Sequence, residues 1–262
     1  MIADRLSGVV GKLLARFLVK PAGYYRPFAV SGSDTLRSVL RPGDVLLVEG
    51  NQRLSTAIKY LTQSTWSHAA LYVGDALHKA GYDGSEPHML VEADLKEGVI
   101  AVPLSKYETF NTRICRPVDL SEEDRQALIQ FVINRLGHQY DLKNVIDLMR
   151  YLIRTPPVPG RWRRRMLALG SGEPTRAICS TLIAQAFQEI RYPVLPRIST
   201  VKKRATDGYT LQEIVHIRHH SLYVPRDFDL SPYFKVVKPT LESGFHYKNL
   251  VWDEAVVNTR PG

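Results

Sequence analysis

The chain has 262 residues, a hydrophobic fraction of 44%, a charged fraction of 23% and a formal net charge of +9. These values are typical of a packed globular protein and exclude a disordered chain. The positive charge favours contact with an anionic surface, but the sequence has no zinc-finger spacing, RNA-binding sheet motif or basic heptad helix, so we expect no nucleic-acid partner. Two cysteines, Cys115 and Cys179, are too few for a disulfide framework, and we expect free thiols.

Residues 1–20 are predicted to form an amphipathic N-terminal helix, because apolar residues recur at helical spacing and basic residues interrupt them. The segment has no clean apolar region followed by a cleavage site, so we expect no secretory signal and a cytoplasmic location. No stretch of the sequence reaches the roughly 18 to 20 apolar residues of a membrane span. Two interpretations of this helix stay open: it packs against its own domain, or it lies peripherally on an anionic membrane.

Residues 21–197 are predicted to form the main domain, which opens with short strands. A Pro-Gly turn at 41–44 introduces the first of them, and the apolar segments that follow are expected as strands near 45–48, 67–74, 89–93, 98–102 and 112–118, with a helix near 54–61. Helices are then expected from a capping sequence at 121–124 to Gly137, over 143–153, and from Cys179 to about residue 190. Strands followed by helices favour an α+β domain with an antiparallel sheet.

Two further segments complete the predicted organisation. Residues 155–175 form an insertion that contains several prolines and a basic cluster from Arg161 to Arg165. We leave open whether the insertion is a lid or a solvated loop, because long loops in compact domains often carry function. Residues 198–262, which prolines interrupt, are predicted to be a C-terminal extension that wraps the domain.

Cys179 stands where a polar loop gives way to a predicted helix. A cysteine attacks as its thiolate, and the first turn of a helix stabilises that charge. On its own, a cysteine here is better explained as a small buried residue. His68, at the head of a predicted strand, is a candidate proton acceptor. Glu92, in the next predicted strand, is a candidate to orient the imidazole, or it lies on an exposed strand face.

Five short segments in this order resemble the circularly permuted NlpC-type papain-like superfamily, and among its members the YaeF/YiiX-type bacterial proteins most of all: 41–44 (RPGD), 67–70 (SHAA), 91–93 (VEA), 137–141 (GHQYD) and 179–180 (CS). The likeness covers roughly residues 36–195. It implies a permuted papain-like domain, with an antiparallel sheet packed on helices, in which the cysteine follows the histidine along the chain.

The resemblance also implies roles for individual residues. Cys179 corresponds to the nucleophile, His68 to the general base and acid, and Glu92 to the residue that orients His68. Tyr140 belongs to a Gly-x-x-Tyr-Asp element and is expected to support the site as a pocket wall. Asp44 is a candidate to contact the substrate, although its position after a Pro-Gly turn makes capping that turn its expected role.

The sequence therefore predicts a cysteine hydrolase that attacks an amide or ester carbonyl through a thioester acyl-enzyme, as an amidase or peptidase. One alternative is a phospholipid or fatty-acyl hydrolase or acyltransferase at a membrane, since residues 1–20 and Arg161 to Arg165 suit an anionic lipid surface. Another is a non-catalytic module that binds lipid or peptide. We expect no cofactor and no metal, because the histidine cluster at 216–220 lacks a zinc-binding spacing.

Overall fold

The computed structural model describes residues 20, 21, 23, 25, 27, 31–82, 86–139, 178–205, 208–216, 219–242, 244–246 and 248. The predicted N-terminal helix apart from residue 20, the predicted helix over 143–153, Tyr140, and the insertion at 155–175 lie outside these residues.

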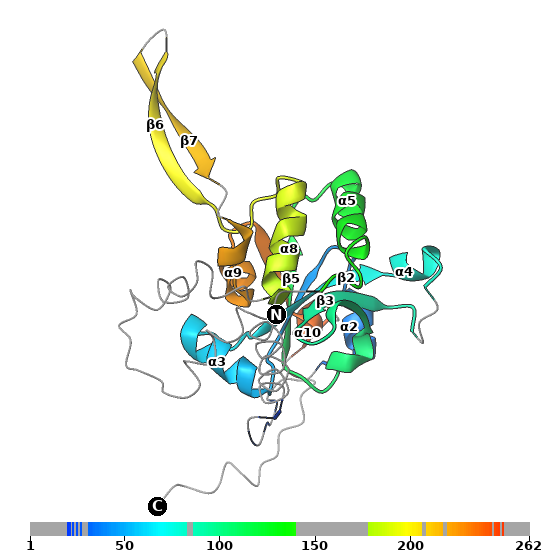
Figure 1. The fold of residues 1–262 in the computed structure, drawn as a ribbon. Helices are drawn as coiled ribbons and strands as arrows, with labels where there is room; N and C mark the ends of the chain where they lie inside the picture. The colour runs from blue at the N-terminus through cyan, green and yellow to red at the C-terminus, as the bar shows by residue number, and fades with distance from the viewer. Residues whose placement is uncertain are drawn as a thin grey trace, which may run out of the picture.

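An antiparallel sheet forms the centre of the described protein (Figure 1). Six of its strands pair in the order β4-β3-β2-β1-β5-β8. Their bounds are β1 Val45–Val48, β2 His68–Gly74, β3 Met89–Asp94, β4 Gly98–Pro103, β5 Thr112–Pro117 and β8 Phe234–Val237. The first five agree with the strands expected from the sequence to within about a residue. All of β1 and nearly all of β2 are buried on both faces of the sheet. Their sequences are therefore continuous apolar runs and do not alternate between apolar and polar residues.

The described helices lie around this sheet. Their bounds are α2 Ser33–Val39, α3 Arg53–Thr62, α4 Ala76–Lys79, α5 Glu122–Ile133, α8 Ile178–Glu189, α9 Pro225–Leu230 and α10 Pro239–Glu242, with 3-10 turns η1 Leu104–Tyr107 and η2 His220–Leu222. The capping prediction for α5 is confirmed, because the Ser121 hydroxyl accepts the backbone N–H of Asp124 at 3.0 Å. The mixed helices and antiparallel sheet confirm the α+β class.

Apolar side chains on the two faces of the sheet belong to two separate cores. On one face, Leu71 of β2 shares a core with Leu182 and Ile183 of α8 and with Leu128 of α5. On the other face, Tyr72 and its neighbours pack with residues of α2 and η1. Alternate residues of β2 thus serve opposite cores, as the two-residue period of a strand requires. The first core holds α8 against β2 and β3.

The C-terminal part of the chain contributes to the same sheet. Strand β8 pairs with β5 and forms an edge of the sheet. Asp229 of α9 accepts hydrogen bonds from Arg113 of β5 and from the indole of Trp66, which ties the helix to the main domain. Between α8 and α9, strands β6 (Arg197–Ala205) and β7 (Gly208–His216) form a hairpin that projects away from the body in Figure 1. The boundary expected at 197/198 stays a prediction.

Candidate active site

Cys179 lies in the first turn of α8, and its side chain is almost enclosed, with 5% of the residue exposed. The imidazole of His68 hydrogen-bonds the thiol, and the backbone N–H groups of Ala69 and Ser180 donate to the sulfur. The hydroxyl of Ser180 donates to the carbonyl of Tyr223 at 2.9 Å, which anchors the start of the helix. The fold thus brings together two residues that are 111 positions apart.

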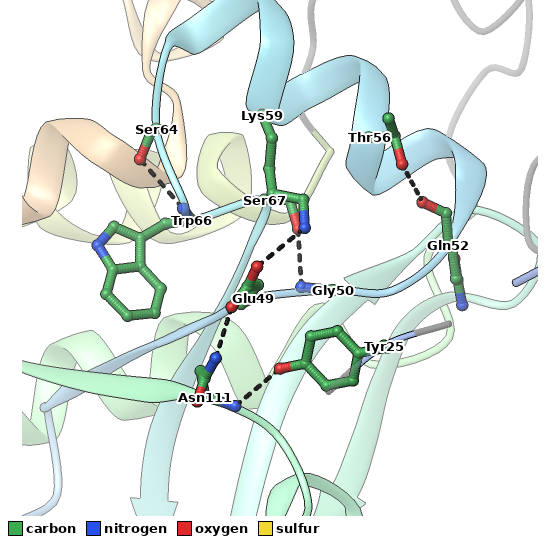
Figure 2. Close-up of polar contacts among 10 residues, drawn as sticks. All are labelled: Tyr25, Glu49, Gly50, Gln52, Thr56, Lys59, Ser64, Trp66, Ser67 and Asn111. Carbon is green, nitrogen blue, oxygen red and sulfur yellow. Dashed lines mark hydrogen bonds and ion pairs between the residues drawn. The ribbon is translucent and has the colours of Figure 1, made fainter. Parts of the chain in front are cut away.

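His68 is the first residue of β2 and pairs with Val48 of β1. The residue before it is also held: the Ser67 hydroxyl accepts the backbone N–H of Gly50 at 2.9 Å (Figure 2). Gly50 has no room for a side chain, because a Cβ there would lie 2.2 Å from the Ser55 hydroxyl and 2.9 Å from the Ser67 hydroxyl. This close approach explains the glycine and fixes where β2 begins.

Polar side chains also hold the chain just after β1 (Figure 2). His68 pairs with Val48, the last residue of β1. The Glu49 carboxylate accepts a hydrogen bond from the Asn111 side-chain amide at 2.6 Å. It also forms an ion pair with Lys59 Nζ at 3.1 Å. The backbone N–H of Glu49 donates to the Asn111 carbonyl, and the Tyr25 hydroxyl accepts the backbone N–H of Asn111. These contacts join β1, α3 and the start of β5 at the end of the sheet where His68 lies.

Glu92 of β3 lies behind the imidazole, with 3.1 Å between Glu92 Oε2 and His68 Nε2. Lys106 Nζ donates to Oε1 of the same carboxylate at 2.6 Å, and the Tyr107 hydroxyl donates to Oε2. Only 2% of the Glu92 side chain is exposed. Its two oxygens are satisfied by three donors, which is what a buried carboxylate requires. Since Nε2 faces Glu92, Nδ1 is the ring nitrogen left for the Cys179 thiol.

The charged forms of Cys179, His68 and Glu92 stabilise one another. Burial alone would lower the pKa of His68, but the charges and hydrogen bonds of Glu92 and Cys179 outweigh it and raise that pKa to about 10. Burial alone would raise the pKa of Glu92, but His68 and Lys106 lower it to about 2. Against its own burial, the Cys179 thiol has its pKa lowered by the His68 charge and hydrogen bond. The arrangement therefore favours a thiolate beside an imidazolium.

The second cysteine provides a contrast within the same chain. Cys115 is fully buried in β5, and burial raises the pKa of its thiol far above the ordinary value. Neither cysteine forms a disulfide. The two thiols therefore differ in the one property that makes a cysteine reactive near neutral pH, the stability of the thiolate.

The structure does not bring Asp44 to this group, and its expected contact with the substrate stays a prediction. Asp44 lies beyond the start of β1, where its backbone pairs with Tyr72, and Tyr72 is four residues along β2 from His68, or about 13 Å. Its carboxylate accepts the backbone N–H of Arg41 at 2.8 Å and an ion pair from Arg116 at 2.7 Å. Its role as the cap of the turn is confirmed.

Other residues considered from the sequence lie elsewhere. Tyr140, the expected pocket wall, falls outside the described residues. His216 hydrogen-bonds the Ser199 hydroxyl at 2.7 Å, and the rings of His219 and His220 contact each other at a tilt of 33°. In the part of the chain that the structure describes, no group of three or more His, Cys, Asp or Glu side chains is arranged to hold a metal.

Sequence reasoning missed Lys106 and Tyr107. Both come from the 3-10 turn η1, which follows β4, and they reach Glu92 across 14 and 15 positions of the chain. A Lys-Tyr pair after a strand is an ordinary surface sequence, and no motif distinguishes it. The only available signal was indirect: a buried Glu92 needs partners, and polar residues in nearby loops are the candidates.

Comparison with known proteins finds a family that is similar to part of this chain. Residues 39–151 match the model of the family described as permuted papain-like amidase enzyme, YaeF/YiiX, C92 family. A similar solved structure is that of the metalloprotein yiiX from Escherichia coli O157:H7, with 16% sequence identity, a TM-score of 0.45, and coverage of 76% of this chain and 96% of that chain. No curated protein matches the chain. Residues 39–151 are therefore similar to the permuted papain-like amidases of the YaeF/YiiX type.

Proposed function

We propose that the protein is a cysteine amidase or peptidase, with Cys179 as nucleophile, His68 as general base and acid, and Glu92 as the residue that orients His68. The contact of the Cys179 thiol with the imidazole, which Glu92 holds at 3.1 Å, carries the proposal. The family's description as a papain-like amidase supports it at the level of a cysteine hydrolase. A hydrolase of this kind needs a nucleophile, a base within reach of it and a group that fixes the tautomer of the base.

The reaction follows from these positions. The Cys179 sulfur attacks the carbonyl carbon and forms a C–S bond, and the electron pair of the carbonyl moves onto oxygen. When the C–N bond breaks, His68 gives its proton to the departing amine and the thioester remains. His68 then takes a proton from water, which attacks the thioester and releases the acid and the free thiol. The backbone N–H of Cys179 is a candidate donor to the oxyanion.

Selective alkylation tests the activated thiol. Iodoacetamide near pH 7 is expected to label Cys179 much faster than Cys115, as measured by mass spectrometry of the two peptides. Cys115 serves as the control within the same molecule, because burial raises its pKa. The variant His68→Ala is expected to slow labelling of Cys179 at least about tenfold, since the thiol loses the imidazolium that stabilises its thiolate. Equal labelling of Cys179 in both proteins would reject the proposal.

The choice between amide and lipid ester substrates needs a direct assay. Release of amine from peptide amides and release of fatty acid from phospholipid vesicles, each compared with Cys179→Ala, distinguish an amidase from a lipid acyl hydrolase. A non-catalytic binding module would show neither activity. Docking on an anionic membrane through residues 1–20 and Arg161 to Arg165 stays a prediction, as does a cytoplasmic, membrane-peripheral location. None of the described helices combines the length and apolar character of a membrane span.

A further inference from the structure

Lys106 is linked to His68 through Glu92, which contacts both side chains. Its ammonium lies 2.6 Å from Glu92 Oε1, while His68 Nε2 lies 3.1 Å from Oε2 of the same carboxylate. Of the two side chains in the Lys106–Glu92 pair, 39% of the lysine and 2% of the glutamate are exposed. Glu92 is thus a buried anion between two cations, one at the protein surface and one at the thiol.

The turn that carries Lys106 is firmly held. Leu104, two residues earlier, is fully buried and its backbone N–H donates to the His88 carbonyl at 3.0 Å. Tyr107, the next residue, is also buried, and its ring is near those of His68 and Phe110, with centroids 6.0 and 5.8 Å away. The Lys106 ammonium lies 5.3 Å from the Tyr107 ring. Its position is therefore set by packed neighbours and by the cation–π contact, as well as by the ion pair.

We propose that Lys106 is a positioning residue that shares the charge of Glu92 with His68 and so sets how tightly the imidazole holds its proton. The proposal rests on the function proposed above, in which His68 must both accept and release a proton. A histidine that faced an unshared, buried carboxylate would keep its proton still more tightly and would release it less readily to the departing amine. Lys106 neutralises part of that carboxylate charge and also repels the imidazolium.

The size of the effect follows from the distances. Because the two cations bind opposite oxygens of one carboxylate, they lie within about 8 Å of each other. One charge at that distance, in the partly screened surroundings of a protein surface, shifts a pKa by about 1.5 units. Among the described residues, the charged or titratable groups that act on His68 directly are Glu92 of β3 and Cys179 of α8. Lys106 and Tyr107 of η1 bind Glu92, Asp94 of β3 acts on Tyr107, and the Glu49–Lys59 pair lies at the end of β1.

The test measures the titration of His68 itself by NMR of its imidazole ring, in the full chain with Cys179→Ala. This background removes the thiolate and so brings the titration of His68 to lower pH. In it, Lys106→Met is expected to raise the pKa of His68 by about 1.5 units. Lys106→Arg keeps the charge and is expected to restore the original value. Lys79→Met removes the lysine of an ion pair with Asp75, which lies beyond the far end of β2 from His68, and is expected to leave the pKa unchanged.

Two results would overturn the proposal: a pKa of His68 that is the same with Lys106→Met as without it, or a shift of equal size with Lys106→Arg. If Lys106→Met does not fold, Lys106→Gln repeats the test, because it removes the charge and keeps a hydrogen-bond donor. The titration does not depend on acyl chemistry at Cys179. A failure of this proposal is therefore separate from a failure of the alkylation experiment, which tests the nucleophile.

Discussion

Glu92 and His68 lie diagonally across neighbouring strands, and 3.1 Å separates Glu92 Oε2 from His68 Nε2. The register pairs Leu71 with Val91, so the same pairing continued by one residue sets Glu92 opposite Ala70, two residues from His68. Diagonal neighbours on one face of a sheet are within reach of long side chains. The orientation of the imidazole is thus built into the strand pairing and does not depend on a flexible loop.

Glu92→Gln is expected to slow alkylation of Cys179 near pH 7 by about tenfold or more. The change keeps the size of the side chain but removes the charge that holds the imidazolium, so the thiolate becomes less stable. The measurement is the rate of iodoacetamide labelling between pH 5 and pH 10. The inflection of that profile is expected to move to higher pH in the variant. An unchanged profile would show that Glu92 does not act on the thiol through His68.

At acid pH, the stability of the folded protein is expected to depend on the protonation of Glu92. The pKa of Glu92 is lowered from an ordinary 4.5 to about 2, so its ionised form stabilises the fold fully above about pH 4.5. That contribution is lost as the pH falls through 4.5 toward 2. The difference in melting temperature between the wild type and Glu92→Gln should therefore shrink from pH 5 to pH 3. A difference that stays constant over this range would contradict the shifted pKa.

Gly50→Ala is expected to lower both the melting temperature and the rate of Cys179 alkylation. The added Cβ would collide with the hydroxyls of Ser55 and Ser67, and a shift of Ser67 moves the adjacent His68. Gly32→Ala is the matched control, because a Cβ there meets no atom within 4 Å. Its alkylation rate should equal that of the wild type. If both variants behave alike, the contact at Gly50 does not position His68.

Asp44→Asn separates structural from catalytic roles. It breaks a buried ion pair with Arg116 and is expected to destabilise the fold by about 3 kcal/mol, measured by urea denaturation. Because Asp44 lies at the far end of β1 from His68, the pH profile of Cys179 alkylation should not move while the protein remains folded. A shifted pH profile would show that Asp44 acts on the Cys179–His68 pair.

Most of the fold was predictable because its signals are local. The apolar runs at 45–48 and 68–74 and the capping sequence before α5 each specify an element by composition and spacing within a few residues. The six-stranded order was not predictable, since pairing of β8 with β5 joins segments more than 100 residues apart through contacts that leave no local pattern. The expected extension after residue 197 therefore includes an edge strand of the central sheet.

The candidate site divides in the same way. The sequence by itself indicated Cys179, His68 and Glu92 as candidates, through a helix start, two strand positions and the resemblance in the order of the segments; their catalytic roles stay a proposal. Only the tertiary structure decided that Lys106 and Tyr107 complete the surroundings of Glu92 and that Asp44 lies elsewhere. The physical reason is that a buried carboxylate must find its donors wherever the fold brings them, so the identity of those donors is set by three-dimensional proximity and not by spacing along the chain.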